Sequence, residues 1–445
     1  MKEEPLDLQV EKLVYGGDGL ARLPADEHGR GKTVFLPFVL PGERVDATLT
    51  QSRSGFARAP LNKVLTPSAD RTEPQCPYFG RCGGCQYQHI AYEAQLRFKA
   101  EILRETLRRT AKLELATEIV VHPSEPWRYR NRTRMRLQHT PAFAVGYFRG
   151  SSHELLPVES CPISSPLINQ AIAAVWELGR AGKVPSTMHG LQYFANHDDS
   201  AMLAELYVRP QSEAGEAERF ARELMSQLSA ITGVALFATS PVEDESRQLA
   251  PLSSVRNEDA AVTGAASIIY HAVGHDYRVS AGSFFQTNRF LVDELVQVAT
   301  AGAAGQCALD LYAGVGLFTL PLAAQFTEVV AVEASPHAVA DLKHNAAGNV
   351  KPFRAATEAF LEQQAARLKP DFILLDPPRA GLGDKATAAL CRTTAAQVTL
   401  VSCDPATLSR DLRQLLESGF KVEQVHLFDL FPQTAHMETV VRLVR

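Results

Sequence analysis

Four short apolar runs in the last third of the chain constrain its fold more than any other feature. Each run is continuous rather than alternating, as is typical of strands buried on both faces of a parallel sheet. Helical stretches separate them, which is the order of a strand–helix repeat. The runs cover residues 308–312, 329–333, 372–376 and 398–401. We therefore predict a Rossmann-like α/β domain over residues 266–445.

The first two runs end in residues that suit a nucleoside-containing ligand. Gly314 and Gly316 follow Asp310 closely, and they let the chain turn tightly while its backbone approaches a ligand. Glu333 ends the second run, where its carboxylate can accept hydrogen bonds from two ribose hydroxyls. The motif has no third glycine in dinucleotide spacing, so we expect S-adenosyl-L-methionine rather than NAD. Read alone, the glycines also fit a purely structural turn.

Two residues with catalytic potential lie beyond the last run. Cys403 follows residues 398–401, so its thiol is expected at the sheet edge that holds the cofactor. A thiol there is either a nucleophile or a small buried apolar residue. Glu438 lies beside the apolar run 439–441, where a charge is unusual. It is either a general base or a solvated residue at a sheet edge.

A group of cysteines predicts a metal site far from these residues in the sequence. Cys76, Cys82 and Cys85 are bunched within ten residues, and we group them with the distant Cys161. Four thiolates can hold either a [4Fe–4S] cluster or a structural zinc ion. The spacing alone leaves both open.

Arginines at every second position predict a charged strand face. If residues 128–137 form a strand, these side chains all project to one side. Like charges on one face favour an anion lying across them, and a phosphate backbone is the natural candidate. A solvated face with acidic partners is the alternative. The residues are Arg128, Arg130, Arg132, Arg134 and Arg136.

Composition and turn signals complete the domain prediction. Short apolar runs separated by glycine-containing turns predict an OB-like β-barrel over residues 1–65. We expect a central α+β domain over residues 66–265, with a helix at 91–110 that packs on the catalytic domain. A net charge of -5 does not by itself indicate a nucleic-acid binder. With neither a signal peptide nor a run of about 20 apolar residues, we expect a cytoplasmic monomer with no membrane partner.

Four motifs, in this order along the chain, resemble those of the RNA uracil-C5 methyltransferases. They are Ser283-Phe-Phe-Gln-Thr-Asn288, Asp376-Pro-Pro-Arg-Ala-Gly381, Ser402-Cys-Asp-Pro-Ala-Thr407 and the segment 431–438 with Pro432, Gln433, His436 and Glu438. The resemblance covers nearly the whole chain. It implies methyl transfer from S-adenosyl-L-methionine to carbon 5 of a uridine in RNA.

The resemblance also implies a role for individual residues. Cys403 adds to carbon 6 of the uracil, which makes carbon 5 nucleophilic, and Glu438 removes the proton from carbon 5. Other positions contact the cofactor or orient the uracil, namely Gln286, Tyr312, Glu333 and Asp376. Leu317 stands where some members carry asparagine, and residues 354–356 offer no polar match for another cofactor contact.

The resemblance finally favours one metal group and one RNA. Members with this cysteine pattern carry a [4Fe–4S] cluster, which here implies cysteines 76, 82, 85 and 161 as ligands. Residues 16–22 and 40–43 resemble a TRAM domain, a small RNA-binding barrel. The two features together are typical of the branch that modifies 23S rRNA. A transfer-RNA enzyme is the rival within the class, and a non-catalytic RNA-binding iron–sulfur protein is the rival outside it.

Overall fold

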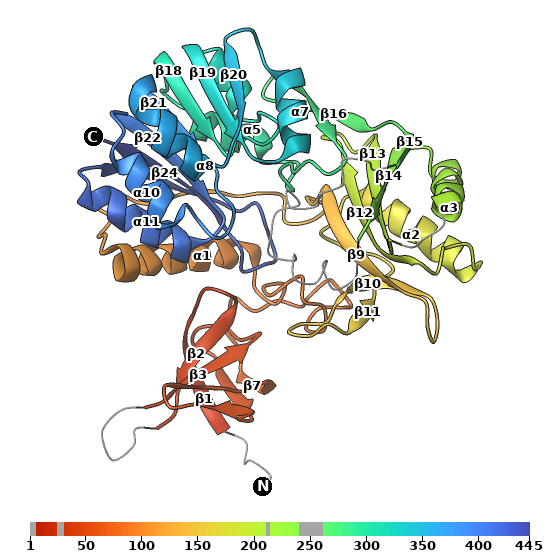
Figure 1. Cartoon of the computed structure of the whole chain (residues 1–445). Helices are drawn as coiled ribbons and strands as arrows, with labels where there is room; N and C mark the ends of the chain where they lie inside the picture. Colours follow the sequence, from red (N-terminus) through yellow and green to blue (C-terminus); the bar gives the residue numbers. More distant parts are fainter. Residues whose placement is uncertain (1–5, 25–30, 211–213, 240–260) are drawn as a thin grey trace.

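The computed structural model describes residues 6–24, 31–210, 214–239 and 261–445. Three sheet-containing units follow one another along the chain (Figure 1). The N-terminal unit, in red, lies below the other two, and the C-terminal unit, in blue and teal, faces the central unit in yellow and green. In the described part of the chain, no helix combines the length and the apolar character that a membrane crossing needs.

The N-terminal unit is a seven-stranded sheet in the order β5-β6-β3-β2-β1-β4-β7. Alternate residues of its strands, such as Val10, Leu36 and Val45, form a small core. Among the described residues no strand pair joins β5 to β7, so the strand order is open at its two ends. The strands are β1 (Leu6–Leu13), β2 (Asp18–Arg22), β3 (Thr33–Pro37), β4 (Arg44–Ala47), β5 (Gln51–Ser52), β6 (Phe56–Arg58) and β7 (Leu61–Thr66).

The central unit is a second seven-stranded sheet, in the order β11-β10-β9-β12-β13-β14-β15. The helices α2 (Pro166–Arg180) and α3 (Ala214–Gln227) pack against the sheet and share its core. Ser165 begins α2, because its hydroxyl accepts a hydrogen bond from the amide of Ile168. The strands are β9 (Arg132–Gln138), β10 (Ala144–Phe148), β11 (Leu155–Pro157), β12 (Met188–Ala195), β13 (Met202–Val208), β14 (Ile231–Ala238) and β15 (Ala261–Gly264).

The C-terminal unit is an eight-stranded sheet in the order β20-β19-β18-β21-β22-β24-β23-β8. All four apolar runs form parallel neighbouring strands, as predicted: β18 (Gly305–Leu311), β19 (Phe326–Glu333), β21 (Phe372–Leu375) and β22 (Gln397–Ser402). The remaining strands are β8 (Val120–His122), β20 (Val350–Arg354), β23 (Lys421–Phe428) and β24 (Glu438–Val444), and β24 runs antiparallel to β22. Helices cover the sheet, among them α5 (Val292–Ala299), α6 (Thr319–Ala323), α7 (Pro336–Asn345), α8 (Thr357–Phe360), α10 (Gly383–Cys391) and α11 (Pro405–Glu417).

A segment from the middle of the sequence is built into this last unit. The helix α1 (Tyr92–Thr106) and the π-helical turn after it (Leu107–Ala111) pack against α11, and β8 pairs with β23. Leu103 and Leu107 share one core with Leu412. Figure 1 shows α1, in orange, along the C-terminal elements. Residues 92–122 therefore pack with the C-terminal unit, and the hairpin of β16 (Ser267–Ala272) and β17 (His275–Ser280) leads from the central sheet into it.

Candidate active site and cysteine pocket

Strand pairing brings Cys403 and Glu438 to the same edge of the C-terminal sheet. Cys403 follows β22 directly, and Glu438 is the first residue of β24. Ser402 pairs with Thr439 across the two strands, so the residues next to this pair lie side by side. Asp376 follows β21, the other neighbour of β22, and joins the same edge.

Burial and mutual repulsion dominate the electrostatics of this edge. Glu438 is only 4% exposed, which excludes a solvated edge residue. Its burial, and then the nearby carboxyl of Asp376, raise its pKa well above the usual range. Burial, and then Glu438, raise the pKa of the Cys403 thiol to about 12, although Arg379 opposes this shift. Cys403 as a whole residue is half-buried.

The turn that carries Cys403 is held by a helix cap. The Asp404 carboxylate accepts hydrogen bonds from the amides of Ala406 and Thr407, both at 2.9 Å, and so begins α11. Its other oxygen accepts a hydrogen bond from the hydroxyl of Tyr15, at 3.0 Å. Tyr15 belongs to the N-terminal unit, 389 residues away in the sequence. The turn that carries Cys403 is thus supported from both units.

The predicted cofactor loop lies at the ends of β18 and β19. One Glu333 oxygen accepts the amide of Gly314 at 3.0 Å, and the other accepts the amide of Ser335 at 2.7 Å. Gly316 has φ of 99°, a conformation that favours glycine, and an added Cβ would approach Leu342 to 3.0 Å. Tyr312 also has a positive φ, of 65°. The glycines thus allow the tight turn that the sequence predicted.

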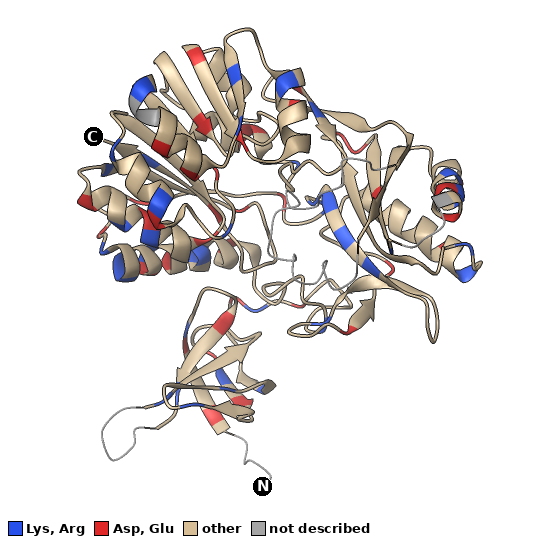
Figure 2. Cartoon of the chain, viewed as in Figure 1, with Lys and Arg blue, Asp and Glu red and all other residues tan. Residues whose placement is uncertain are grey.

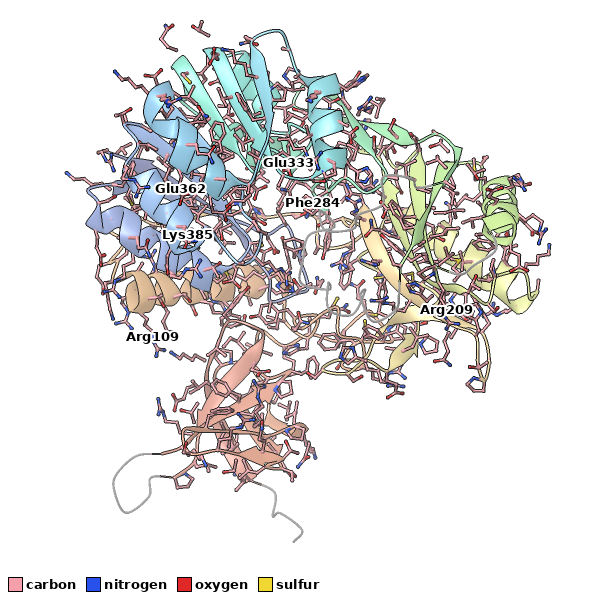
Figure 3. All side chains as sticks on the ribbon, viewed as in Figure 1. Arg109, Arg209, Phe284, Glu333, Glu362 and Lys385 are labelled. Atoms are coloured by element: carbon pink, nitrogen blue, oxygen red, sulfur yellow. The ribbon has the colours of Figure 1, made fainter. Side chains whose placement is uncertain are left out.

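Further acids and an amide surround this loop. Asp310 is fully buried, accepts a hydrogen bond from the hydroxyl of Thr319, and has its pKa raised by burial to about 7. Gln286 donates to the Asp376 carboxylate at 3.4 Å, and burial followed by Asp310 raises the pKa of Asp376 to about 7. Figure 3 labels Phe284 and Glu333 where the C-terminal unit faces the central one. Four predicted cofactor residues therefore lie at the carboxyl ends of β18, β19 and β21 or in the neighbouring 283–288 segment: Tyr312, Glu333, Asp376 and Gln286.

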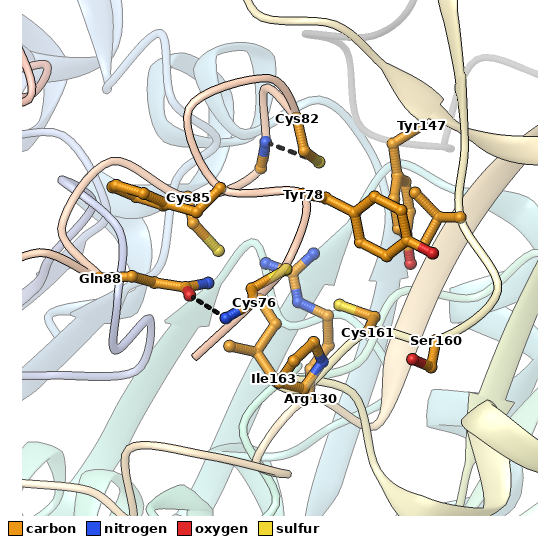
Figure 4. Close-up of a pocket in the computed structure, with 14 residues that line it drawn as sticks. Cys76, Tyr78, Cys82, Cys85, Gln88, Arg130, Tyr147, Ser160, Cys161 and Ile163 are labelled. Carbon is orange, nitrogen blue, oxygen red and sulfur yellow. Dashed lines mark hydrogen bonds between the residues drawn. The ribbon is translucent and has the colours of Figure 1, made fainter. Parts of the chain in front are cut away.

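All four predicted cysteine ligands line one pocket (Figure 4). Its empty volume is about 480 Å³, the opening to solvent included. The Gly84 amide donates to the Cys82 sulfur at 3.4 Å, and the Cys76 amide donates to Gln88 at 3.1 Å. All four thiols are free. They are Cys76, Cys82, Cys85 and Cys161.

The five arginines do not form one strand face, because β9 begins only at Arg132. Arg128 precedes the strand, is exposed and has φ of 56°. Arg130 lines the cysteine pocket. Arg132 is 7% exposed, and its guanidinium donates to the Ser283 carbonyl at 2.8 Å and contacts Glu205, so we no longer expect it to bind RNA. Arg134 lies over the Tyr207 ring at 4.1 Å. Figure 2 marks basic residues along β9, the strand of the central unit that lies toward the C-terminal unit.

Comparison with known families gives these sites a context. A TRAM domain model matches residues 4–61. A model described as tRNA (uracil-5-)-methyltransferase matches residues 91–445, which is most of the chain. The chain belongs to the tRNA (uracil-5-)-methyltransferase family. It is an RNA (uracil-C5)-methyltransferase that uses S-adenosyl-L-methionine and carries an N-terminal TRAM domain, which excludes the non-catalytic alternative.

Full-length relatives agree with this membership. An uncharacterised RNA methyltransferase of Aquifex aeolicus is 32% identical to the methyltransferase over 100% of this chain and 99% of its own length. The 23S rRNA (uracil(1939)-C(5))-methyltransferase RlmD of Shewanella frigidimarina is 32% identical over 98% of this chain and 95% of its own length. The structure of a Pyrococcus abyssi tRNA (uracil-54, C5)-methyltransferase bound to S-adenosyl-L-homocysteine has a TM-score of 0.74 over 99% of this chain and 100% of its own, at 22% identity. That likeness shows a shared fold.

Sequence reasoning missed several residues that shape the methyltransferase site. Tyr15 directly precedes the Gly16-Gly17 turn, and Arg379 lies inside a motif that we quoted without giving it a role. Gln95 and Lys99 occupy polar positions of α1 that look exposed in the sequence, yet both are fully buried. Only their three-dimensional partners, described below, show what they do.

Proposed function

We propose that the methyltransferase methylates carbon 5 of a uridine in 23S rRNA, with Cys403 as nucleophile and Glu438 as base. The observation that carries this is the pairing of Ser402 with Thr439, which places both side chains at one sheet edge. Cofactor contacts are assigned to Gln286, Tyr312, Gly314, Gly316, Glu333 and Asp376, which lie at or beside this edge.

The proposed reaction balances as an addition followed by an elimination. The Cys403 thiol first loses its proton to solvent, and the thiolate adds to carbon 6; carbon 5 then takes the methyl group from the sulfonium, which leaves as a neutral thioether. Glu438 then accepts the proton of carbon 5. The electron pair of that C–H bond forms the C5–C6 double bond, and the C6–S bond breaks to return the thiolate. Product and enzyme are then free.

The raised pKa of Glu438 favours methyl transfer first and proton abstraction second. Methyl transfer requires the sulfonium beside carbon 5, and therefore near the base. Its positive charge favours the ionised carboxylate before the transfer. Once the methyl group has left, the thioether is neutral, and the burial that raises the pKa of Glu438 is no longer opposed by that charge. The base therefore becomes stronger at the step that needs it.

The cysteine pocket supports a [4Fe–4S] cluster over a zinc ion. A tetrahedral zinc ion, with bonds of about 2.3 Å, would draw its four sulfurs to about 3.8 Å from one another. Here the four thiols line the walls of one pocket, and their Cys-x5-Cys-Gly-Gly-Cys spacing with a distant Cys-Pro is the pattern that the family resemblance links to the cluster. We expect iron and a visible absorbance band after anaerobic purification; stoichiometric zinc without iron would overturn the assignment.

Two arginines remain as proposed RNA contacts. Arg128 is exposed, and Arg134 is a half-buried residue of β9. We expect charge reversal at Arg128 to weaken RNA binding and to lower its salt dependence, because a phosphate contact releases counterions.

The choice of 23S rRNA rests on the full-length match to an RlmD relative together with the four-cysteine pocket. Mapping 5-methyluridine in ribosomal and transfer RNA from cells with and without this gene tests it. We expect a 23S rRNA site to lose its methyl group in the deletion strain. Loss from transfer RNA alone would instead establish the transfer-RNA enzyme.

A further inference from the structure

Glu438 ends a segment that other parts of the chain hold along most of its length. We call residues 429–437 the base segment. The fully buried Lys99 of α1 donates to the Asp429 carboxylate at 2.5 Å and to the Phe431 carbonyl at 3.1 Å. The Tyr129 hydroxyl donates to the Pro432 carbonyl at 3.0 Å. The backbone that leads to the base is thus fixed from two sides.

Gln433 is the strained point of the base segment. Its φ of 68° is unusual for a residue with a side chain and needs support from its surroundings. Gln95 supplies this support with a reciprocal pair. Its carbonyl oxygen accepts the Gln433 amide at 3.0 Å, and its amide group donates to the Gln433 side-chain oxygen at 3.0 Å. Gln95 is fully buried, so water does not replace either bond.

The cysteine-bearing loop contacts the same point from the other side. The amides of Gln86 and Tyr87 both donate to the Gln433 carbonyl, at 3.1 and 2.9 Å. The Gln86 side chain accepts the Ala435 amide at 3.2 Å and donates to the Gly83 carbonyl at 3.0 Å. Gln86 directly follows Cys85 in the sequence. One side chain therefore links the cysteine pocket to the base segment.

We propose that Gln95 and Gln86 are positioning residues for proton abstraction, and that through Gln86 the cysteine loop sets the place of the catalytic base. The inference rests on the proposed role of Glu438. Cys403 has a separate support, the Asp404 cap of α11. Loss of either glutamine should therefore slow the step that uses Glu438 and spare the steps that use Cys403.

The test follows both halves of the reaction in a single turnover. The substrate is total RNA from cells that lack this gene, which carries the unmodified target of either class. Gln95→Met and Gln86→Ala are compared with Glu101→Gln, an exposed position on α1. S-adenosyl-L-homocysteine reports methyl transfer, and the covalent protein–RNA adduct on a denaturing gel reports elimination. Iron content and the unfolding temperature are measured for each variant.

We expect both glutamine variants to form S-adenosyl-L-homocysteine near the wild-type rate. The adduct should live at least about tenfold longer, because a misplacement of about 1 Å can cost about a hundredfold in rate. Adduct lifetimes equal to wild type, or equal slowing of both steps, would overturn the inference. Gln86 is partly exposed, so its variant decides the question if Gln95→Met does not fold. If Glu438→Gln itself traps no adduct, the proposed role of Glu438 fails instead.

Discussion

As the proposed nucleophile, Cys403 has to lose a proton beside acids that oppose the loss. Burial sets most of its raised pKa, of about 12, and Glu438 and Asp376 add to it, while Arg379 works in the other direction. A resting thiol is therefore protonated at neutral pH. This protects it from oxidation and alkylation, since only the thiolate reacts readily. Removing one of the acids should therefore change the pKa of Cys403.

We predict that Glu438→Gln lowers the pKa of Cys403, because a neutral amide no longer repels the thiolate. Iodoacetamide should then label Cys403 faster at pH 8 than it labels the wild-type enzyme, as followed by mass spectrometry of the Cys403 peptide. Glu417→Gln, at an exposed site on α11, serves as the control and should leave the rate unchanged. An equal or slower rate in Glu438→Gln would show that the carboxylate does not act on the thiol.

At the scale of elements, α1 buries polar as well as apolar side chains, and its sequence pattern predicted only the apolar ones. Its apolar spacing predicted the helix, and Leu103 is indeed fully buried. Lys99 is also fully buried, against Asp429 at a separation of 330 residues. A single-helix pattern cannot reveal such a partner, because lysine normally lies on the solvated face.

Breaking this buried pair should destabilise the enzyme strongly. Lys99→Met leaves the Asp429 carboxylate buried without its partner, and we expect a loss of about 3–5 kcal/mol in the free energy of unfolding. Arg97→Met is the matched control, because it removes the exposed pair with Asp70 and should cost at most about 1 kcal/mol. Urea unfolding of both variants measures the difference. Similar losses would mean that the buried pair is not a special anchor.

The sequence predicted the parallel strands correctly but not the surroundings of the arginines. Continuous apolar runs identify strands buried on both faces, because the signal lies within each run. The arginine pattern also lies within one short segment, but the residues that surround the arginines in the fold come from distant parts of the chain. Arg132 finds Ser283 and Glu205 at 151 and 73 residues away, and Arg130 meets cysteines from two distant segments. Alternation alone could not separate solvated from buried charges.

At the scale of the whole molecule, the three units meet around the sheet edge that carries Cys403 and Glu438. The N-terminal unit contributes Tyr15 to the Asp404 carboxylate. The central unit joins the 283–288 motif through backbone bonds, including Asn131 to the Thr287 carbonyl at 3.1 Å. The sequence motifs identified the segments that form the site, but they did not reveal these hydrogen bonds between units, which depend on how the units pack together. The TRAM domain is therefore part of the site's framework as well as a candidate RNA contact.

Tyr15→Phe tests this framework. It removes a single hydrogen bond to a charged group, worth about 1.5–3 kcal/mol, and loosens the turn that carries Cys403, the proposed nucleophile. We expect slower formation of the covalent adduct with unchanged adduct decay, in single-turnover measurements. Glu11→Gln, an exposed change in the same unit, should alter neither rate. Slower decay in Tyr15→Phe would place the tyrosine with the base and not with the nucleophile.

The central claim is that Cys403 and Glu438 divide one reaction into addition and elimination. Mass spectrometry of Glu438→Gln after incubation with S-adenosyl-L-methionine and the unmodified RNA tests it most directly. We predict a peptide in which Cys403 carries a uridine nucleotide with one added methyl group. An adduct at another residue, or full release of methylated RNA by this variant, would contradict the account.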